Sequence, residues 1–426
     1  MSEDNRVFIT GFSALTASGA TADDNWDQIK SGKSSIAEIE QYDLSTWEYR
    51  LGGELKNFEP AKMLPDRKLM KVISRQDVMG INAAVQAVEH SQLLQFRDTL
   101  ASADSFNEET AVYVGSPGNK YFQQYDFLPL VAKSNKDMQH FARDLFGEVH
   151  PMWLLRILPN NVLAYAGITY GFKGINQNVT NHAVSGTQAI IEAYHAIKNG
   201  QAKRALVVAY DAAAEPQALY YYEKLGVLSA KHLKPFDRDH DGTILAEGAA
   251  AIILESEESV KERGATCYGE IAGGLSHSEA AGLFSIESNG AHLASLINEL
   301  LTRVNLTTDD IGLIVAHGNG NQKSDLSEAA AINEVFAQKC TPVTAFKWSM
   351  GHTVCASGVI DTVLTTYALR NKCIPGIANL ENTATSCDNL NISSETRSLA
   401  ANKTSALLIN RGFASMNACL VINYGA

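Results

Sequence analysis

Short apolar runs rich in β-branched residues alternate along the chain with longer segments whose apolar residues recur at helical spacing. The runs predict buried strands, and the longer segments predict amphipathic helices. The predicted strands span residues 7–10, 111–114, 175–180, 205–209, 249–254, 267–272, 311–316, 343–346, 406–410 and 418–423. The predicted helices span residues 77–92, 187–199, 291–303, 324–338 and 359–370. This alternation indicates an α/β fold of βαβ units with mostly parallel, buried sheets.

The alternation of predicted strands and helices in the first half recurs in the second half, which indicates a duplicated α/β unit. We place the two halves at residues 1–256 and 257–426. The segments 55–63 and 116–159 do not fit the alternation, so we expect them to leave the core.

Composition changes this picture little, because 45% of the residues are hydrophobic and 19% are charged, as in an ordinary globular protein. No uncharged apolar run is long enough to span a membrane, and the polar N-terminal residues lack the basic and apolar parts of a signal peptide. We therefore expect a cytoplasmic protein without a membrane partner. The formal net charge of −12 argues against nucleic acid as the main partner.

The six cysteines, at positions 267, 340, 355, 373, 387 and 419, all lie in the second part of the chain. None has a close cysteine neighbour of the Cys-x-x-Cys kind, so we expect no metal site and a reduced compartment.

One segment has the form of a site for a nucleophile. Residues 178–190 read Asn-Val-Thr-Asn-His-Ala-Val-Ser-Gly-Thr-Gln-Ala-Ile, a predicted strand followed by small residues and a predicted helix. Such a junction directs backbone N–H groups and the positive end of a helix dipole at one point. Proteins use that point to activate a nucleophile or to hold an oxyanion. Ala183, at the tip of this elbow, has no reactive atom.

Three loops that follow predicted strands add further candidates. The first carries His317, the second carries Lys347 and His352, and the third carries Phe413. Loops at the carboxyl ends of strands are where the sites of α/β sheets gather. Two histidines and a lysine in such loops can polarise a carbonyl or assist loss of a carboxylate. Taken singly, a histidine after a strand is more often a packed or solvated residue than a catalytic one.

Long motifs in a fixed order connect these loops to one family. They are residues 7–14 (Val-Phe-Ile-Thr-Gly-Phe-Ser-Ala) with Gly19, residues 235–242 (Pro-Phe-Asp-Arg-Asp-His-Asp-Gly) followed by Ala246-Glu247-Gly248-Ala249, His317-Gly318 with Asp325 and Glu328, Lys347 with Gly351-His352, and Gly412-Phe413 with Asn417. Nearly end to end, the chain resembles a β-ketoacyl-acyl-carrier-protein synthase. The resemblance implies a thiolase-like fold, with duplicated βαβ halves packed as a five-layer αβαβα sandwich. It gives Asp325, Glu328 and Glu247 supporting roles and Phe413 the role of a gate. No cofactor is implied beyond acyl chains carried on the phosphopantetheine of an acyl carrier protein.

In active members of the family, a cysteine at the elbow accepts the acyl chain and the two histidines assist decarboxylation of a malonyl substrate. Alignment through Ser185-Gly186-Thr187 puts that cysteine at Ala183, whose methyl group cannot form a thioester. Further departures are Asn181-His182 for Thr-Ala, Ala414-Ser415 for Gly-Gly, and Arg411 at a position usually apolar. His182 and Ser185 are poor substitute nucleophiles, because Ser185 matches an ordinary family residue and the flanks do not form Gly-x-Ser-x-Gly.

Four interpretations fit these departures. They are a natural chain-length factor that pairs with an active ketosynthase, an enzyme with an engineered Cys→Ala change at position 183, a malonyl-decarboxylating priming subunit, and a structural or carrier-docking module. Because the neighbours of Ala183 are altered too, we favour the chain-length factor, which would not condense by itself. Type II polyketide, polyene (including aryl polyene) and fatty-acid synthesis are the settings that the resemblance implies.

The resemblance also implies partners. We expect a heterodimer with an active ketosynthase, with a homodimer as the alternative. The resemblance places Met152 and Trp153 where side chains of a partner reach toward the acyl tunnel. The two residues are either determinants of chain length or plain interface core. The basic residues Arg67, Lys68 and Lys71 are a candidate docking site for the carrier protein, or a solvated helix face.

Overall fold

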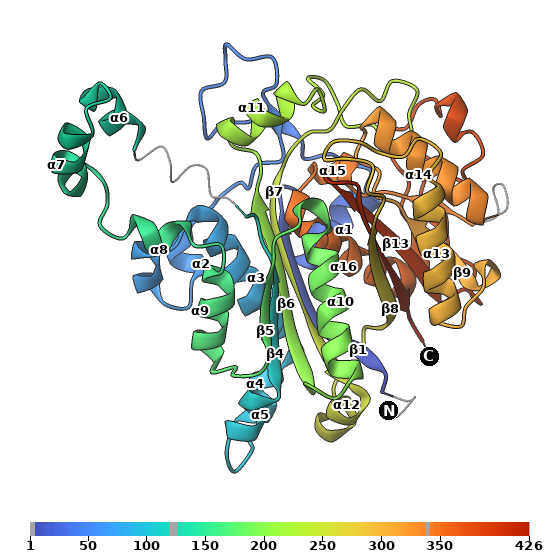
Figure 1. Cartoon of the computed structure of the whole chain (residues 1–426). Helices are drawn as coiled ribbons and strands as arrows, with labels where there is room; N and C mark the ends of the chain where they lie inside the picture. Colours follow the sequence, from blue (N-terminus) through green and yellow to red (C-terminus); the bar gives the residue numbers. More distant parts are fainter. Residues whose placement is uncertain (1–4, 119–126, 337–340, 426) are drawn as a thin grey trace.

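The fold is that of a computed structural model, which describes residues 5–118, 127–336 and 341–425 (Figure 1). Within these residues ten strands form one continuous sheet, in the order β10-β9-β13-β14-β8-β1-β7-β6-β4-β5. The strands of the first half are β1 (Val7–Thr16), β4 (Thr110–Gly115), β5 (Asn176–Val179), β6 (Arg204–Ala212) and β7 (Glu247–Ser256). Those of the second half are β8 (Gly269–Ser278), β9 (Ile311–Val315), β10 (Val343–Thr344), β13 (Ser405–Gly412) and β14 (Met416–Asn423).

The two halves have the same topology. In each half, the first strand pairs antiparallel with the last, and the last pairs antiparallel with the fourth. The fourth then pairs parallel with the second, and the second pairs parallel with the third. The halves join where β1 meets β8, through Phe8 opposite Glu270 and Ile9 opposite Gly269. The predicted duplication is therefore present in the backbone.

The prediction of mostly parallel sheets was wrong, because antiparallel pairings outnumber parallel ones in this mixed sheet. The physical reason is that the apolar runs report burial on both faces and carry no information about strand direction. All of β7, for example, is buried. Helices cover both faces of these strands, so antiparallel strands acquire the continuous apolar pattern typical of parallel ones.

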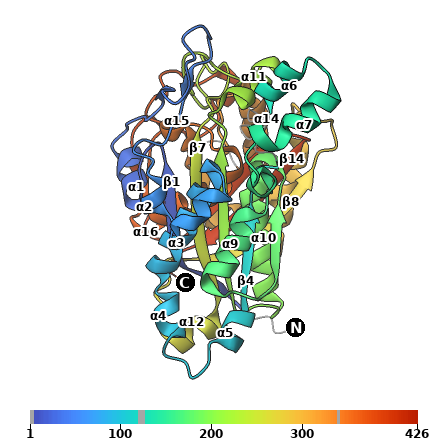
Figure 2. The same cartoon turned by 90° about the vertical axis from the view of Figure 1, so that its left-hand side faces the viewer.

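Two central helices lie between the sheets of the two halves (Figures 1 and 2). They are α10 (Ser185–Lys198) and α16 (Ser357–Arg370), which contact each other. α10 packs on β4 and β6 and also on β8, while α16 packs on β7 and β13. On the outer faces, α3 (Arg75–Ser91) and α9 (Asn161–Tyr170) cover the first half, and α13 (Ala291–Arg303) packs beside α14 (Gln322–Val335) on the second. These layers form the αβαβα sandwich of the thiolase-like fold, as expected.

Local capping and turns explain the differences at element ends. Ser74 accepts a hydrogen bond from the Asp77 N–H in a capping box, so α3 begins at Arg75, ahead of the predicted residue 77. The strand predicted over 343–346 is limited to β10, because the chain turns into α15 (Lys347–Met350). α14 ends at Val335, and residues 337 and 338 of the predicted helix lie outside the described residues.

The remaining elements lie around this core. They are α1 (Ala22–Lys30), α2 (Pro60–Met63), α4 (Leu93–Arg97), α5 (Asp104–Glu108), α11 (Pro216–Lys224), α12 (Glu257–Arg263), β2 (Ala37–Glu38), β3 (Leu51–Gly52), β11 (Cys373–Ile374), β12 (Arg397–Ser398), and the 3-10 turns η1 (Arg67–Lys71), η3 (His182–Val184), η4 (Thr308–Asp310), η5 (Val354–Ala356) and η6 (Thr385–Cys387). None of the helices in the described part of the chain is long and apolar enough to cross a membrane.

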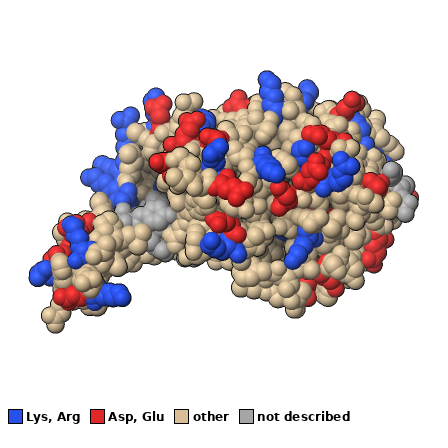
Figure 3. Space-filling model, turned by 90° about the horizontal axis from the view of Figure 1, so that it is seen from above, with Lys and Arg blue, Asp and Glu red and all other residues tan. Residues whose placement is uncertain are grey.

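One segment extends away from the body, as Figures 1 and 3 show. This arm consists of α6 (Leu128–Ser134) and α7 (Met138–Glu148), which pack on each other, and α8 (Trp153–Ile157) leads from it back toward α9. Large apolar side chains of the arm are exposed, with Phe146 at 84% and Met138 at 68%. The predicted excursion of residues 116–159 is thus confirmed for its described part.

Candidate active site

The predicted elbow lies between β5 and α10. Its tip is η3, which places Ala183 fully buried just before the first turn of α10. Ser185 Oγ accepts a hydrogen bond from the Asn181 N–H and donates to the His182 carbonyl, each at 2.7 Å. Ser185 is therefore committed to holding the turn, which agrees with the prediction that it is no nucleophile.

The His182 ring fills the space beside this tip. Its backbone has φ of 52°, a left-handed conformation that directs the side chain out of the turn. The Phe413 N–H donates to Nδ1 at 3.2 Å, so Nε2 carries the ring proton and donates to Tyr222 Oη at 2.5 Å. The ring also stacks on Phe413, with centroids 4.0 Å apart. Burial lowers the pKa of His182 to about 4, so the ring is neutral at neutral pH.

The two predicted histidines are brought together. His317 follows β9 and His352 precedes η5, and their ring centroids lie 5.2 Å apart in an edge-to-face arrangement. His352 Nδ1 lies 3.2 Å from Ser357 Oγ, whereas His317 Nδ1 is buried without a hydrogen-bond partner among the described residues. Burial, with the charge of Lys347, lowers the pKa of both rings well below its ordinary value. The pair is thus neutral and able to donate or accept hydrogen bonds.

Lys347 acts on the histidines through its charge. Its ammonium group is buried and forms an ion pair with Asp361 of α16 at 3.1 Å. Asp361 also accepts a hydrogen bond from Asn410 at 2.9 Å. The lysine is therefore fixed in place by its partners and favours neutral imidazoles nearby.

Two of the predicted supporting carboxylates accept hydrogen bonds from backbone N–H groups. Glu328 accepts hydrogen bonds from the backbone N–H groups of His317 (2.7 Å) and Gly318 (3.0 Å), and burial raises the pKa of Glu328 to about 7. Asp325 accepts from the Phe236 N–H and lies 3.0 Å from His240 Nδ1. Glu328 therefore positions His317, whereas Asp325 fixes the segment that carries Phe236 and His240.

Arg411 anchors the loop that carries Phe413. It is buried, and its guanidinium group pairs with Glu279 at 2.7 Å and donates to Asn417 and to the Ser324 carbonyl. Removing one partner of such a buried ion pair costs several kcal/mol of stability, because the remaining charge stays buried without compensation. The arginine therefore ties β13, β14 and the segment after β8 together.

The residues that replace the two expected glycines keep the backbone that glycine would adopt. Ala414 and Ser415 have φ of 60° and 57°, which costs about 1 kcal/mol or more for each residue. The Ala414 N–H donates to the Leu283 carbonyl at 2.7 Å, and Ser415 Oγ donates to the Gly282 carbonyl at 2.8 Å. These bonds hold the loop closed over Ala183.

Two cavities meet at this closed loop. The smaller, of about 250 Å³, is lined by His317, His352 and Arg411. The larger, of about 640 Å³, is lined by Asp211 and Cys355, among others. His182, Tyr222, Leu225, Phe284 and Phe413 line both cavities. These shared residues, which we call the aromatic partition, stand between the histidine pair and the larger cavity.

Comparison with known proteins agrees with this geometry. The family model for the N-terminal domain of β-ketoacyl synthases matches residues 4–259, and that for the C-terminal domain matches residues 268–381. The chain belongs to the β-ketoacyl synthase family. Among curated relatives, the 3-oxoacyl-[acyl-carrier-protein] synthase 2 of Synechocystis sp. is 27% identical, with 98% of each chain covered. A putative polyketide β-ketoacyl synthase 1 of Streptomyces cyaneus is also 27% identical, with 90% of each covered.

Solved structures show the same ketosynthase fold. The ishigamide ketosynthase/chain length factor superposes with a TM-score of 0.89 at 23% identity, covering 99% of this chain and all of that one. A type II polyketide ketosynthase in complex with its acyl-carrier protein superposes with a TM-score of 0.83 at 21% identity, over 99% of this chain and all of that one.

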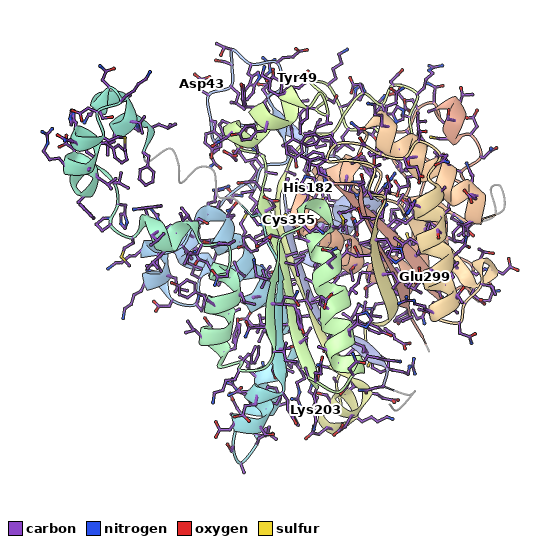
Figure 4. The ribbon with its side chains drawn as sticks, in the orientation of Figure 1. Asp43, Tyr49, His182, Lys203, Glu299 and Cys355 are labelled. Atoms are coloured by element: carbon purple, nitrogen blue, oxygen red, sulfur yellow. The ribbon has the colours of Figure 1, made fainter. Side chains whose placement is uncertain are left out.

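A second ketosynthase elbow, missed by the sequence analysis, mirrors the first. η5 precedes α16 as η3 precedes α10, and Cys355-Ala356-Ser357-Gly358 aligns with Ala183-Val184-Ser185-Gly186. Figure 4 shows His182 and Cys355 close together at the upper ends of the strands. A Cβ on Gly186 would lie 2.8 Å from the Cys355 carbonyl, so the elbows approach through their glycines. The shared Ser-Gly step was the signal available in the sequence.

Other predicted residues lie away from the cavities. Glu247 pairs with Arg75 at 2.7 Å, which identifies its supporting role as a link between β7 and α3. Met152 and Trp153 lie at the start of α8 near the surface, and Trp153 packs edge-on against Phe127 at 4.8 Å. Their role toward a partner stays a prediction.

The three predicted docking residues lie together on η1. Arg67, Lys68 and Lys71 are all exposed there. Within the described residues, no group of three or more His, Cys, Asp or Glu side chains has the geometry of a metal site.

Proposed function

We propose that this chain is a non-condensing ketosynthase subunit, a chain-length factor that pairs with an active ketosynthase and shapes the acyl tunnel. The observation that carries the proposal is the state of the elbow. Ala183 offers no nucleophile there, and His182 takes up the Phe413 N–H that faces the same point. Neither thioester formation nor oxyanion binding is supported by this arrangement.

Coordinated changes favour a natural loss over a single engineered substitution. His182 is bonded to Phe413 and Tyr222, and Arg411 is bonded to Glu279. An engineered Cys→Ala change at position 183 would leave these partnerships unexplained. Together these contacts surround Ala183, which has no reactive side chain.

A free surface supports pairing with a second subunit. β5 lies at the edge of the sheet, and the nearby Ile168 and Ile175 are 73% and 42% exposed. An open strand edge beside apolar side chains is typical of a subunit interface. Superposition of the whole chain on a ketosynthase/chain length factor structure is consistent with this arrangement. An acyl carrier protein, docked at Arg67, Lys68 and Lys71, would be the third component.

A second candidate function is decarboxylation of a malonyl thioester. His317 and His352 share one cavity, are neutral, and keep Lys347 behind them. This arrangement is able to stabilise the enolate left by loss of carbon dioxide. A priming subunit would need no thiol at position 183.

The test compares the purified chain, alone and with an active ketosynthase, for malonyl-carrier decarboxylation and chain elongation. We expect no elongation by the chain alone, a changed product length with the partner, and a further change with Trp153→Ala but not with the exposed control Gln139→Ala. Elongation by the chain alone, or identical partner products with and without it, would contradict the proposal. Decarboxylation by the chain alone that is lost in His317→Ala and His352→Ala would establish the second function instead.

A further inference from the structure

Two buried polar side chains that line the larger cavity, Gln76 and Asp211, are not used by the proposed function, and we call them its polar floor. Gln76 of α3 lines this cavity, is 3% exposed, and its Nε2 has no hydrogen-bond partner among the described residues. A buried amide donor without an acceptor costs about 1–3 kcal/mol. Such a group is explained when a ligand supplies the acceptor.

Asp211 provides the complementary acceptor. It lies on β6, is 7% exposed, and lines the same cavity. One carboxylate oxygen accepts from the Cys355 N–H at 3.3 Å. Burial raises the pKa of Asp211 to about 6, so the carboxylate is still ionised at neutral pH. The neighbouring Glu215 is used differently, since it accepts from the Ala218 N–H at 2.7 Å and caps α11.

Most of the remaining lining is apolar or aromatic. It includes Ala212, Ala213 and Ala218, with Tyr222 and Phe413 of the aromatic partition, while Glu215 and Lys224 are its further charged residues. The cavity therefore suits a largely apolar ligand that carries one polar group, and its volume of about 640 Å³ is that of a small-molecule site.

The chemistry of the floor selects among polar groups. An ammonium group cannot accept a hydrogen bond, so it would leave Gln76 Nε2 without an acceptor. A carboxylate would be repelled by the charge of Asp211. A hydrocarbon end would leave both groups buried without a ligand partner. A hydroxyl group both accepts and donates a hydrogen bond, and it carries no charge.

We propose that the larger cavity binds the hydroxyl-bearing end of an acyl chain, which the Gln76 amide and the Asp211 carboxylate recognise together. That the ligand is an acyl chain rests on the proposed function, whereas the choice of a hydroxyl end rests on these two side chains. The cavity thereby distinguishes a hydroxylated chain from a plain hydrocarbon chain of the same length.

The experiment measures binding of ω-hydroxydodecanoyl and dodecanoyl thioesters of N-acetylcysteamine by calorimetry, to the chain alone and to its assembly with the ketosynthase. We expect the hydroxylated probe to bind about tenfold more tightly. Gln76→Leu and Asp211→Leu should each reduce the preference to below about twofold, while Thr180→Val, which lines the same cavity, should keep it. Since Gln76 has no partner to lose, Gln76→Leu retains the fold even if Asp211→Leu does not.

Equal binding of the two probes, or a preference that survives Gln76→Leu, would overturn the inference. If the preference is absent but product length with the partner still changes, this inference fails and the proposed function stands. If the preference is present but partner products never change, the proposed function fails and the cavity keeps its selectivity.

Discussion

His182 is a second obstacle to catalysis at the elbow, in addition to the missing nucleophile at Ala183. Its ring accepts a hydrogen bond from the Phe413 N–H and stacks on the Phe413 ring. Both the backbone and the side chain of Phe413 are therefore held by His182. A backbone donor at a developing oxyanion is worth about 10²–10³ in rate. Replacing Ala183 alone would leave that donor occupied.

We therefore predict that Ala183→Cys alone does not restore elongation, although it supplies a thiol. The double variant His182→Ala/Ala183→Cys frees the Phe413 N–H and should be faster than the single variant by about 10²-fold. Single-turnover acyl transfer and elongation with malonyl-carrier substrate measure the difference. The pair His182→Ala/Ala183→Ser is the control, because it opens the same space without a thiol. Full elongation by Ala183→Cys alone would show that His182 is no obstacle.

The same ring should make stability depend on pH. The pKa of His182 is lowered from 6.5 to about 4 in the folded state, so the folded protein binds a proton less readily than the unfolded chain. Its contribution to stability is present above the unfolded pKa and is lost as pH falls from 6.5 toward 4. Relative to His182→Phe, which stacks but cannot titrate, we expect the wild type to lose about 2 kcal/mol between about pH 7 and about pH 5. Urea unfolding at both pH values measures this, and an unchanged difference between the two proteins would contradict it.

The sequence predicted the motif residues of the site better than it predicted the residues that pack around them. His317, His352 and Phe413 follow strands in recognisable motifs, and the structure brings them to one cavity. Tyr222 reaches the site from α11 through tertiary packing, and Asp211, at the carboxyl end of β6, stands in no recognisable motif. Their contribution depends on which side chains the fold places opposite the elbow, and this information is not local in the sequence.

At the scale of elements, the duplication explains both what was predicted and what was not. Most strand positions followed from apolar runs, since strands such as β1, β6 and β7 are buried along their whole length. Strand directions did not, because burial on two faces looks the same for either direction. The repeated elbow also explains backbone strain, since His182 and Val354 occupy equivalent positions and have φ of 52° and 39°. The two halves therefore share one turn geometry at η3 and η5, although the side chains at the two turns differ.

At the scale of the whole molecule, the arm stands out because packing within the chain leaves its large apolar side chains exposed. α6 and α7 pack on each other and project from the body (Figures 1 and 3). Their exposed apolar residues include Phe146, Met138 and Val131. Patches of this kind usually mark protein–protein contacts. The arm is therefore a candidate contact for the second subunit that we propose.

If the arm forms part of the proposed interface, Phe146→Asp should weaken pairing with the proposed ketosynthase partner by about tenfold or more, because a large apolar side chain is replaced by a charge that must be desolvated. The melting temperature of the isolated chain should stay the same, since Phe146 is 84% exposed and supports little of the fold. Sedimentation equilibrium measures the association, with Gln139→Asp on the same helix as the control for added charge. Equal weakening by both substitutions would point to the charge of the arm instead of its apolar face. Unchanged association in Phe146→Asp would remove the arm from the interface, leaving the β5 edge to hold the subunits together.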